Sequence, residues 1–277
     1  MTDKKKKQLF AWFGSLMVAF ICLTPFIWMI VVSFAKYPDF LASENIPYVF
    51  TLGNYVQVLT SKDLHVLDYF KNSLITAFVV VIATVIIASL AGYAVSRIRF
   101  KGKQAIILGI LAVSMFPQVA VVGYLFELMA KIGWINTYYA LIFPYIAWVL
   151  PLSLWILISY FMQLPKDLDE AAMIDGASRL QVLAKVIVPV AAPGIFSTAL
   201  LTFISSFNEF MFALLLTTDY HTRTIPVGIA LFEGLHGEIP WGQIMATSVI
   251  AALPLVIMTL IFQRYIVQGL TAGALKG

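Results

Sequence analysis

Charged residues and cysteine are scarce in this chain of 277 residues. Only 12% of the residues are charged, against about a quarter in a typical soluble domain, while 61% are hydrophobic and the mean hydropathy is +0.92. This balance excludes an ordinary soluble protein and predicts an integral membrane protein. The single cysteine, Cys22, lies within an apolar run and can form no disulfide within the chain. It therefore carries no information on redox compartment and is expected to be a small packing residue.

Motifs for nucleotide hydrolysis and for other hydrolytic chemistry are also missing. The sequence has no GxxxxGK[ST] phosphate loop, because Gly102-Lys103 lacks both the earlier glycine and the following hydroxyl residue. It has neither an HExxH nor a GxSxG motif, which leaves an intramembrane hydrolase as a weak alternative. The chain is therefore expected to be non-catalytic and to lack the means to power transport alone.

Long apolar runs separated by short polar loops predict an all-α fold of six transmembrane helices. At ~20 residues for each span, 277 residues accommodate six spans with their loops. No polar segment is long enough for a separate soluble domain, so one transmembrane domain is expected over residues 1–277. The predicted spans are about 9–35, 72–96, 105–128, 138–161, 187–217 and 244–267, and Pro117, Pro144, Pro151 and Pro254 are expected to kink them.

Lysine and arginine lie mainly on one side of this topology. Thirteen of the eighteen belong to the amino terminus, the loop after the second span, the loop at 163–186 and the carboxyl terminus. The positive-inside rule therefore places both termini and the 163–186 loop in the cytoplasm. Residues 218–242 then form an outer loop and residues 268–277 a cytoplasmic tail. This topology explains the basic pI without a nucleic-acid partner.

A charged interruption between two apolar runs, residues 164–195, predicts two short helices. Asp167 or Asp169 can cap the first, whose first turn is acidic, and Gly176 supplies a left-handed residue at its end. Ser178 can cap the second. That second helix places four apolar residues on one face: Leu180, Leu183, Ala184 and Ile187. Small residues beside charges on the first helix favour a helix that docks into a groove of another protein, and the alternative is a solvated connector.

The segment EAAMIDGA, followed by Ile187 and Pro189, closely resembles the EAA loop of ABC importer permeases. Val188 stands before the proline where many members of that family have leucine. In that family this loop is the coupling helix that docks into a cleft of a cytoplasmic ATPase. The resemblance implies that the ATPase binds ATP and Mg, that this chain holds no cofactor, and that the docking residues here are Glu170, Ala171, Ala172, Ile174, Asp175, Gly176 and Ala177.

Polar residues also occur inside the predicted fifth span. A carboxylate in an apolar span usually faces a polar cavity or a partner, so Ser205, Asn208 and Glu209 are expected on the substrate pathway. Phe203 and Phe207 are candidate aromatic surfaces for a sugar ring, with core packing or lipid contact as the alternative. The alternative is that Glu209 lies near the outer interface and only bonds a neighbouring helix. Permeases of the family often carry an Asn-Asp or Asn-Glu pair here, on a helix that partly lines their substrate passage.

The outer loop contains two histidines with nearby acids, but their spacing fits no common zinc pattern, so no metal site is predicted. Val227-Gly228-Ile229 and Trp241-Gly242 are similar to a segment of maltose-type permeases. In those permeases the outer loop reaches into the sugar cleft of the binding protein. The resemblance therefore implies binding-protein contacts for Glu233, His236 and Glu238.

The carboxyl-terminal string GLTAGALKG resembles the end of the second permease subunit of maltose-type importers, with Leu275 where valine is more usual. In that subunit the tail runs along the ATPase dimer interface. The resemblance therefore implies ATPase contacts for Gly269, Thr271, Lys276 and Gly277. Without it, a frayed end would be expected.

Together these resemblances imply a permease subunit of an ATP-driven, binding-protein-dependent importer of a di- or oligosaccharide. The expected location is the inner or plasma membrane of a bacterial or archaeal cell. The expected partners are a homologous permease, two ATP-binding subunits, an external sugar-binding protein and membrane lipid, without nucleic acid. The alternative is an ion-coupled secondary transporter, but such carriers usually bury more carboxylates at depth than the lone Glu209.

Overall fold

The computed structural model describes residues 3–36, 49–232 and 239–274. Apart from one isolated bridge between Ala35 and Phe50, these residues form helices, turns and irregular segments. The helices are α1 Asp3–Ser33, α2 Gly53–Thr60, α3 Val66–Arg97, α4 Lys103–Ser114, α5 Gln118–Lys131, α6 Tyr138–Gln163, α7 Asp167–Ile174, α8 Arg179–Val182, the π-helical turn η1 Leu183–Ile187, α9 Val188–Val190, α10 Ala192–Phe207, α11 Met211–Leu216, α12 Ile225–Ala230 and α13 Trp241–Ala274. The all-α prediction is confirmed.

Within the described ranges, four helices are long and apolar enough to cross a membrane alone, at Phe10–Ser33, Val66–Arg97, Tyr138–Gln163 and Trp241–Gln263. Two further pairs satisfy the same criterion only together. Helices α4 and α5 meet at 88°, and the segment Arg179–Val190 meets α10 at 83°. Up to six spans are therefore present if each bent pair counts as one. The predicted third run, 105–128, and fifth run, 187–217, are both interrupted rather than continuous.

Proline accounts for the first of these breaks. Helix α4 ends in a tight turn, in which the Met115 and Phe116 amides donate to carbonyls three residues earlier. Pro117 follows with extended backbone, at φ −70° and ψ 130°, and has no N–H to continue the helix. Helix α6, by contrast, continues through Pro144 and Pro151 without interruption.

The second break combines a π-helical turn with two prolines. The Val188 amide donates to the Leu183 carbonyl, five residues back, immediately before Pro189. Pro189 has no amide for the carbonyl of Lys185, so a wider turn at this point relieves the clash that its ring would otherwise cause. Ala191 then leaves the helical region of backbone space, and α10 starts with Pro193 in its first turn.

The chain divides into two compact units. Unit 1 comprises Met1–Leu67 and Gly228–Leu253, and unit 2 comprises Asp68–Val227 and Pro254–Gly277. In unit 1 the Asn54 side-chain amide donates to the carbonyls of Ser33 and Ala35, both at 2.9 Å, which ties α2 to the end of α1. Val58, Val66 and Ala246 form a small buried cluster there.

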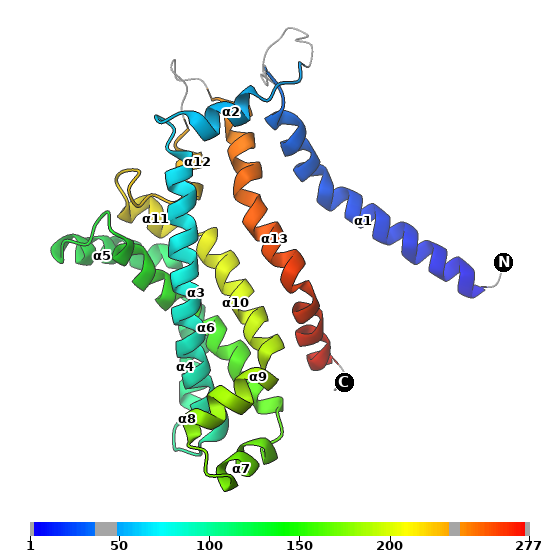
Figure 1. The fold of residues 1–277 in the computed structure, drawn as a ribbon, viewed down its shortest axis with the longest axis vertical. Helices are drawn as coiled ribbons and strands as arrows, with labels where there is room; N and C mark the ends of the chain where they lie inside the picture. Colours follow the sequence, from blue (N-terminus) through cyan, green and yellow to red (C-terminus); the bar gives the residue numbers. More distant parts are fainter. Residues whose placement is uncertain (1–2, 37–48, 233–238, 275–277) are drawn as a thin grey trace. The chain divides into compact units, whose positions relative to one another are not determined.

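Unit 2 contains two larger buried clusters. The first joins α3, α6, α8 and η1 and includes Tyr93, Phe161, Val182, Leu183 and Ile187. The second joins α3, α5, α6, α11 and α12 and includes Leu141, Tyr145, Phe212, Leu216 and Val227. Figure 1 shows α7 and α8 beyond one end of α3, α6 and α10, with α11 toward the opposite end.

Candidate functional site

Helix α7, Asp167–Ile174, begins differently from the prediction and ends as predicted. Lys166 occupies the N-cap position and its side chain makes no capping hydrogen bond, so neither Asp167 nor Asp169 has the predicted capping role. At its end, the Ala177 amide donates to the Ala172 carbonyl and Gly176 adopts φ +86°, the left-handed conformation that glycine favours. Ser178 caps the next helix through a reciprocal capping box with Gln181.

The outer face of α7 carries most of the predicted docking residues. Glu170, Ala171 and Asp175 are exposed, and Ile174 is 86% exposed. Ala172 and Ala177 are instead partly buried, because they pack against the cluster of Val182, Leu183 and Ile187. Ala172 and Ala177 are therefore only partly accessible, and the fully exposed residues of α7 and the turn after it are Glu170, Ala171, Met173, Ile174, Asp175 and Gly176.

The inner face of α7 carries a buried carboxylate. The Tyr93 hydroxyl donates to Asp169 Oδ1 at 2.8 Å, and Arg97 Nε forms an ion pair with Asp169 Oδ2 at 3.0 Å. The side chains of Arg97 and Asp169 are only 4% and 7% exposed. Arg97 also donates through Nη1 to the Leu164 carbonyl at 3.1 Å and through Nη2 to the Pro165 carbonyl at 3.5 Å. We call these three side chains the Tyr93–Arg97–Asp169 cluster.

Sequence reasoning missed this cluster. The sequence predicts a capping role for Asp167 or Asp169, and it assigns the basic residues after the second span, which include Arg97, only to the topology. Helical periodicity offered one signal, since Asp169 and Ala172 are three residues apart and so share a face. An acid on the face that carries small apolar residues predicts a buried partner, although the sequence does not identify which cation supplies it.

A groove of about 440 Å³ runs beside α7. Its walls are Arg97, Ile98, Arg99, Lys166, Asp169, Glu170, Met173 and Arg179. Four of these residues are cations and two are acids, and one of the acids, Asp169, is already paired with Arg97. The groove is therefore basic, with Glu170 on its rim next to the exposed face of α7.

At the other end of unit 2, Glu209 is buried and fully engaged by neighbouring donors. Its Oε1 accepts the Phe212 amide and the Gln118 side-chain amide, each at 2.8 Å, and its Oε2 accepts the Ala213 amide at 3.2 Å. The carboxylate thus satisfies the first amides of α11 and ties them to the start of α5. The geometry favours the alternative in which Glu209 bonds a neighbouring helix.

The other predicted pathway residues differ in burial, since one is buried and two are exposed. Phe203 is 1% exposed, stacks on Phe207 with ring centroids 5.6 Å apart, and contacts Phe78. It is a core residue rather than an exposed surface for a sugar ring. Ser205 and Asn208 are exposed.

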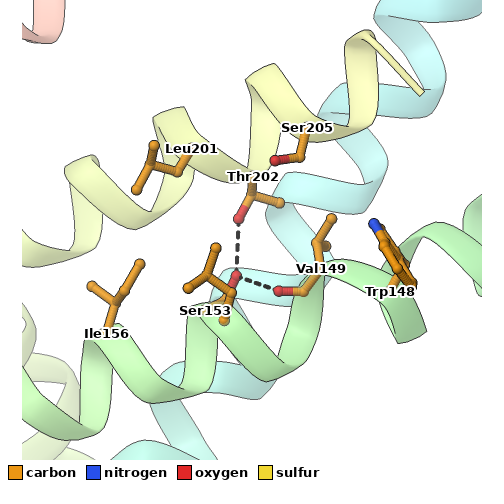
Figure 2. A pocket seen from close by; sticks show the side chains of 8 residues that line it. Trp148, Val149, Ser153, Ile156, Leu201, Thr202 and Ser205 are labelled. Atoms are coloured by element: carbon orange, nitrogen blue, oxygen red, sulfur yellow. Dashed lines mark hydrogen bonds between the residues drawn. The ribbon is translucent and has the colours of Figure 1, made fainter. Parts of the chain in front are cut away.

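Ser205 lines a small depression between α6 and α10. Its volume is about 70 Å³, and Trp148, Ser153 and Thr202 contribute to its walls (Figure 2). The Ser153 and Thr202 hydroxyls lie 3.0 Å apart and join the two helices. Binding sites for drug-sized ligands are ~300–1,000 Å³, so this depression accommodates a water or a hydroxyl group rather than a whole ligand.

Two asparagines hold the start of the loop predicted at 218–242. Asn136 Oδ1 accepts from the Thr218 and Asp219 amides and the Thr222 hydroxyl, while the Asn72 amide donates to the carbonyls of Tyr220 and Arg223. Hydrogen bonds from the Asn136 side chain and the His221 amide lower the pKa of Asp219 below its usual value. In the described residues no three His, Cys, Asp or Glu side chains converge into a metal site.

The remaining predicted contacts cannot be placed. Glu233, His236, Glu238, Lys276 and Gly277 lie outside the described residues. Gly269 and Thr271 belong to the last turns of α13, where the structure describes the helix but not the side-chain surroundings.

Comparison with known proteins identifies the family. Residues 84–272 match the family described as binding-protein-dependent transport system inner membrane component. The chain is 63% identical to the trehalose/maltose transport system permease protein MalG of Thermococcus litoralis, over 100% of both chains. It is 38% identical to the trehalose transport system permease protein SugB of Mycobacterium tuberculosis, over 92% of this chain and 93% of that protein.

A solved structure has the same fold. One chain of a bacterial ABC transporter involved in the import of the acidic polysaccharide alginate superimposes with a TM-score of 0.76 at 20% identity, covering 94% of this chain and 97% of that chain. The resemblance to importer permeases is thus confirmed, and an ion-coupled secondary transporter is not favoured. The chain belongs to the family of binding-protein-dependent transport system inner membrane components and is a multi-pass membrane subunit of an ABC importer.

Proposed function

We propose that this chain is a permease subunit that imports a di- or oligosaccharide with energy from ATP hydrolysed by separate subunits. It pairs with a homologous permease, binds two ATP-binding subunits on the cytoplasmic side, and receives sugar from an external binding protein. Support for the substrate class comes from relatives that are named for trehalose and maltose, for trehalose, and for arabino-oligosaccharides. The cell membrane of a bacterium or archaeon is the expected location.

The observation that carries this proposal is the exposed face of α7. Ile174 is 86% exposed although it lies outside the apolar spans, and Ala171 beside it is small and exposed. Burying an aliphatic side chain of this size contributes about 1.5–3 kcal/mol, so a partner that covers Ile174 gains binding energy. Glu170 adds a charge for a cation of the partner, and Gly176 allows the turn that presents the helix.

Transport then needs no covalent chemistry in this chain. Hydrolysis of ATP, which the ATPase subunits bind with Mg, supplies the energy, and closure of those subunits displaces α7. Because α7 packs on η1 and the core of unit 2, its displacement moves the spans attached to that core. The tail residues Gly269, Thr271, Lys276 and Gly277 add ATPase contacts, and the outer-loop residues Glu233, His236 and Glu238 contact the binding protein.

The residues at the end of α10 and directly after it have separate roles in this proposal. Ser205 and Asn208 are exposed and can bond sugar hydroxyls as they pass. Phe203 and Glu209 are buried and support the helices that carry them. The depression at Ser205 holds about 70 Å³, so it offers single hydroxyl contacts rather than a closed sugar site.

The proposal is tested by reversing the charge at the docking face. Glu170→Lys in the intact transporter is expected to leave expression and the permease pair unchanged but to abolish sugar uptake, because it places a cation where the ATPase must present one. The matched control is Glu127→Lys, a charge reversal at an exposed acid on α5. Uptake of radiolabelled trehalose or maltose into proteoliposomes gives the measurement. Normal uptake in the Glu170 variant would refute the docking role.

A further inference from the structure

The Tyr93–Arg97–Asp169 cluster joins α3, α7 and the connection between α6 and α7, and the Arg97 guanidinium group contacts the last two. Tyr93 and Arg97 lie in the last turns of α3, and Asp169 lies in the first turn of α7. The carbonyls that Arg97 binds belong to Leu164 and Pro165, which connect α6 to α7. A change in the position of any one element therefore disturbs contacts to the other two.

Burial distinguishes this cluster from the surface ion pairs of the chain. Lys131 and Glu127 form a pair whose side chains are 71% and 63% exposed, and such pairs contribute little because water screens them. The Arg97 and Asp169 side chains are 4% and 7% exposed, so separating them leaves two charges largely out of contact with water, each without its opposite charge. The buried pair therefore keeps α7 and α3 in one fixed relation.

Apolar contacts hold the rest of the inner face of α7. Leu168, Ala172 and Ala177 pack against the buried cluster that contains Val182, Leu183 and Ile187. The helix is thus attached to α3 by charge, to the end of α6 through backbone carbonyls, and to η1 by packing. Its outer face is free of such contacts, since Glu170, Ala171 and Ile174 are exposed.

We propose that Tyr93, Arg97 and Asp169 are positioning residues that pass a displacement of α7 directly to α3 and α6. The inference rests on the proposed function, because it requires a partner that moves α7. Arg97 and Asp169 also form part of the wall of the basic groove of about 440 Å³, next to Glu170. A partner seated on α7 therefore lies beside the pair that connects it to the spans.

The experiment measures coupling rather than assembly. Three variants weaken the cluster while keeping its volume: Asp169→Asn, Arg97→Lys and Tyr93→Phe. Each is placed in the complete transporter in proteoliposomes with binding protein and maltose or trehalose. We expect the ATPase subunits to stay bound and to hydrolyse ATP. The amount of sugar imported per ATP should fall about tenfold in Asp169→Asn and Arg97→Lys and about twofold in Tyr93→Phe.

Matched controls isolate the cluster from its surroundings. Asp167→Asn removes a carboxylate from the same helix at an exposed position, and Arg99→Lys makes the same conservative exchange in the adjoining loop. Both are expected to keep the wild-type ratio of sugar to ATP. A similar loss of coupling in these controls would overturn the specific role of the cluster.

Two other results would also overturn the inference. One is a wild-type ratio in Asp169→Asn and Arg97→Lys. The other is release of the ATPases from those variants while Tyr93→Phe keeps the wild-type ratio, which would assign the cluster to assembly instead. Failure of the proposed docking is recognised separately, because it appears as normal uptake with Glu170→Lys and says nothing about the ratio in the cluster variants.

Discussion

Asp169 and Glu209 are two buried carboxylates with different kinds of partner. Asp169 accepts a hydrogen bond from the Tyr93 hydroxyl and forms an ion pair with Arg97, and both partners lie in the distant helix α3. Glu209 accepts hydrogen bonds from the backbone amides of Phe212 and Ala213, in the turn that follows it, and from the side-chain amide of Gln118. The first acid is neutralised by a cation, whereas the second is stabilised by dipoles.

Asp169 therefore connects separate helices, whereas Glu209 is mainly a local feature of the turn that contains it. Most of the donors to Glu209 move with it, because they lie three and four residues further along the chain. The partners of Asp169 do not move with it, so its stability depends on how α3, α6 and α7 are arranged. Of the two acids, Asp169 is the better reporter of movement at the proposed ATPase-facing end.

The largest effect is expected from removing the cation. Arg97→Met preserves much of the side-chain volume but leaves the Asp169 carboxylate buried without the cation that pairs with it. Breaking a buried pair in this way should destabilise the protein by about 3–5 kcal/mol. The shift of the unfolding midpoint of the purified permease, followed by tryptophan fluorescence, measures it.

The double variant Arg97→Met with Asp169→Leu provides the control. Because both charges are gone, it should recover a large part of the stability lost in the single variant. A double variant as unstable as the single one would mean that packing volume, and not the unpaired charge, accounts for the loss.

A smaller effect is expected at the other acid. Glu209→Ala removes the acceptor for the Phe212 and Ala213 amides and for Gln118, and should destabilise the permease by about 1–3 kcal/mol. The loss is smaller than at Arg97 because neutral donors, and no charge, are left unsatisfied. The same unfolding assay applies, and sugar uptake should fall without release of the ATPases.

Gln118→Leu separates the two kinds of donor at Glu209. It removes only the contact to α5 and keeps both backbone amides, so it should cost about 1 kcal/mol. If this variant were as unstable as Glu209→Ala, the connection to α5 would dominate and the description of Glu209 as a local feature would be incorrect.

The smallest effect is expected where the partners are entirely local. Ser178→Ala removes the cap of α8 that follows the exposed turn after α7, and should cost about 0.5 kcal/mol because the position is exposed. Sugar imported per ATP should remain at the wild-type value. A large loss of coupling here would show that the turn, rather than the Tyr93–Arg97–Asp169 cluster, sets the position of α7.

Features that depend on neighbouring residues could be predicted from the sequence. The stop at Gly176, the cap at Ser178 and the apolar character of Leu183 and Ile187 all follow from local chemistry, and the structure confirms each. Leu180 and Ala184, predicted on the same apolar face, are instead exposed, Leu180 to 67%. The reason is that α8 is short and the following turn is π-helical, so the spacing of an ordinary helix does not apply.

Features that depend on distant residues could not be predicted in the same way. Asp169 fits an acidic first turn, and this local explanation concealed its partner Tyr93, which lies 76 positions earlier. The sequence predicts only a kink at Pro117, yet this proline separates two helices that meet at 88°. A missing amide predicts a break but not its angle, because the angle is set by what each half packs against.

The contact between Gly194 and Tyr160 has a consequence for how this sequence can vary. A Cβ at Gly194 would lie 2.5 Å from the Tyr160 ring, so the helices α6 and α10 meet here without room for any other side chain. A larger residue at position 194 can be accepted only together with a smaller one at position 160. These two positions are therefore expected to change jointly among homologues, although neither takes part in any chemistry.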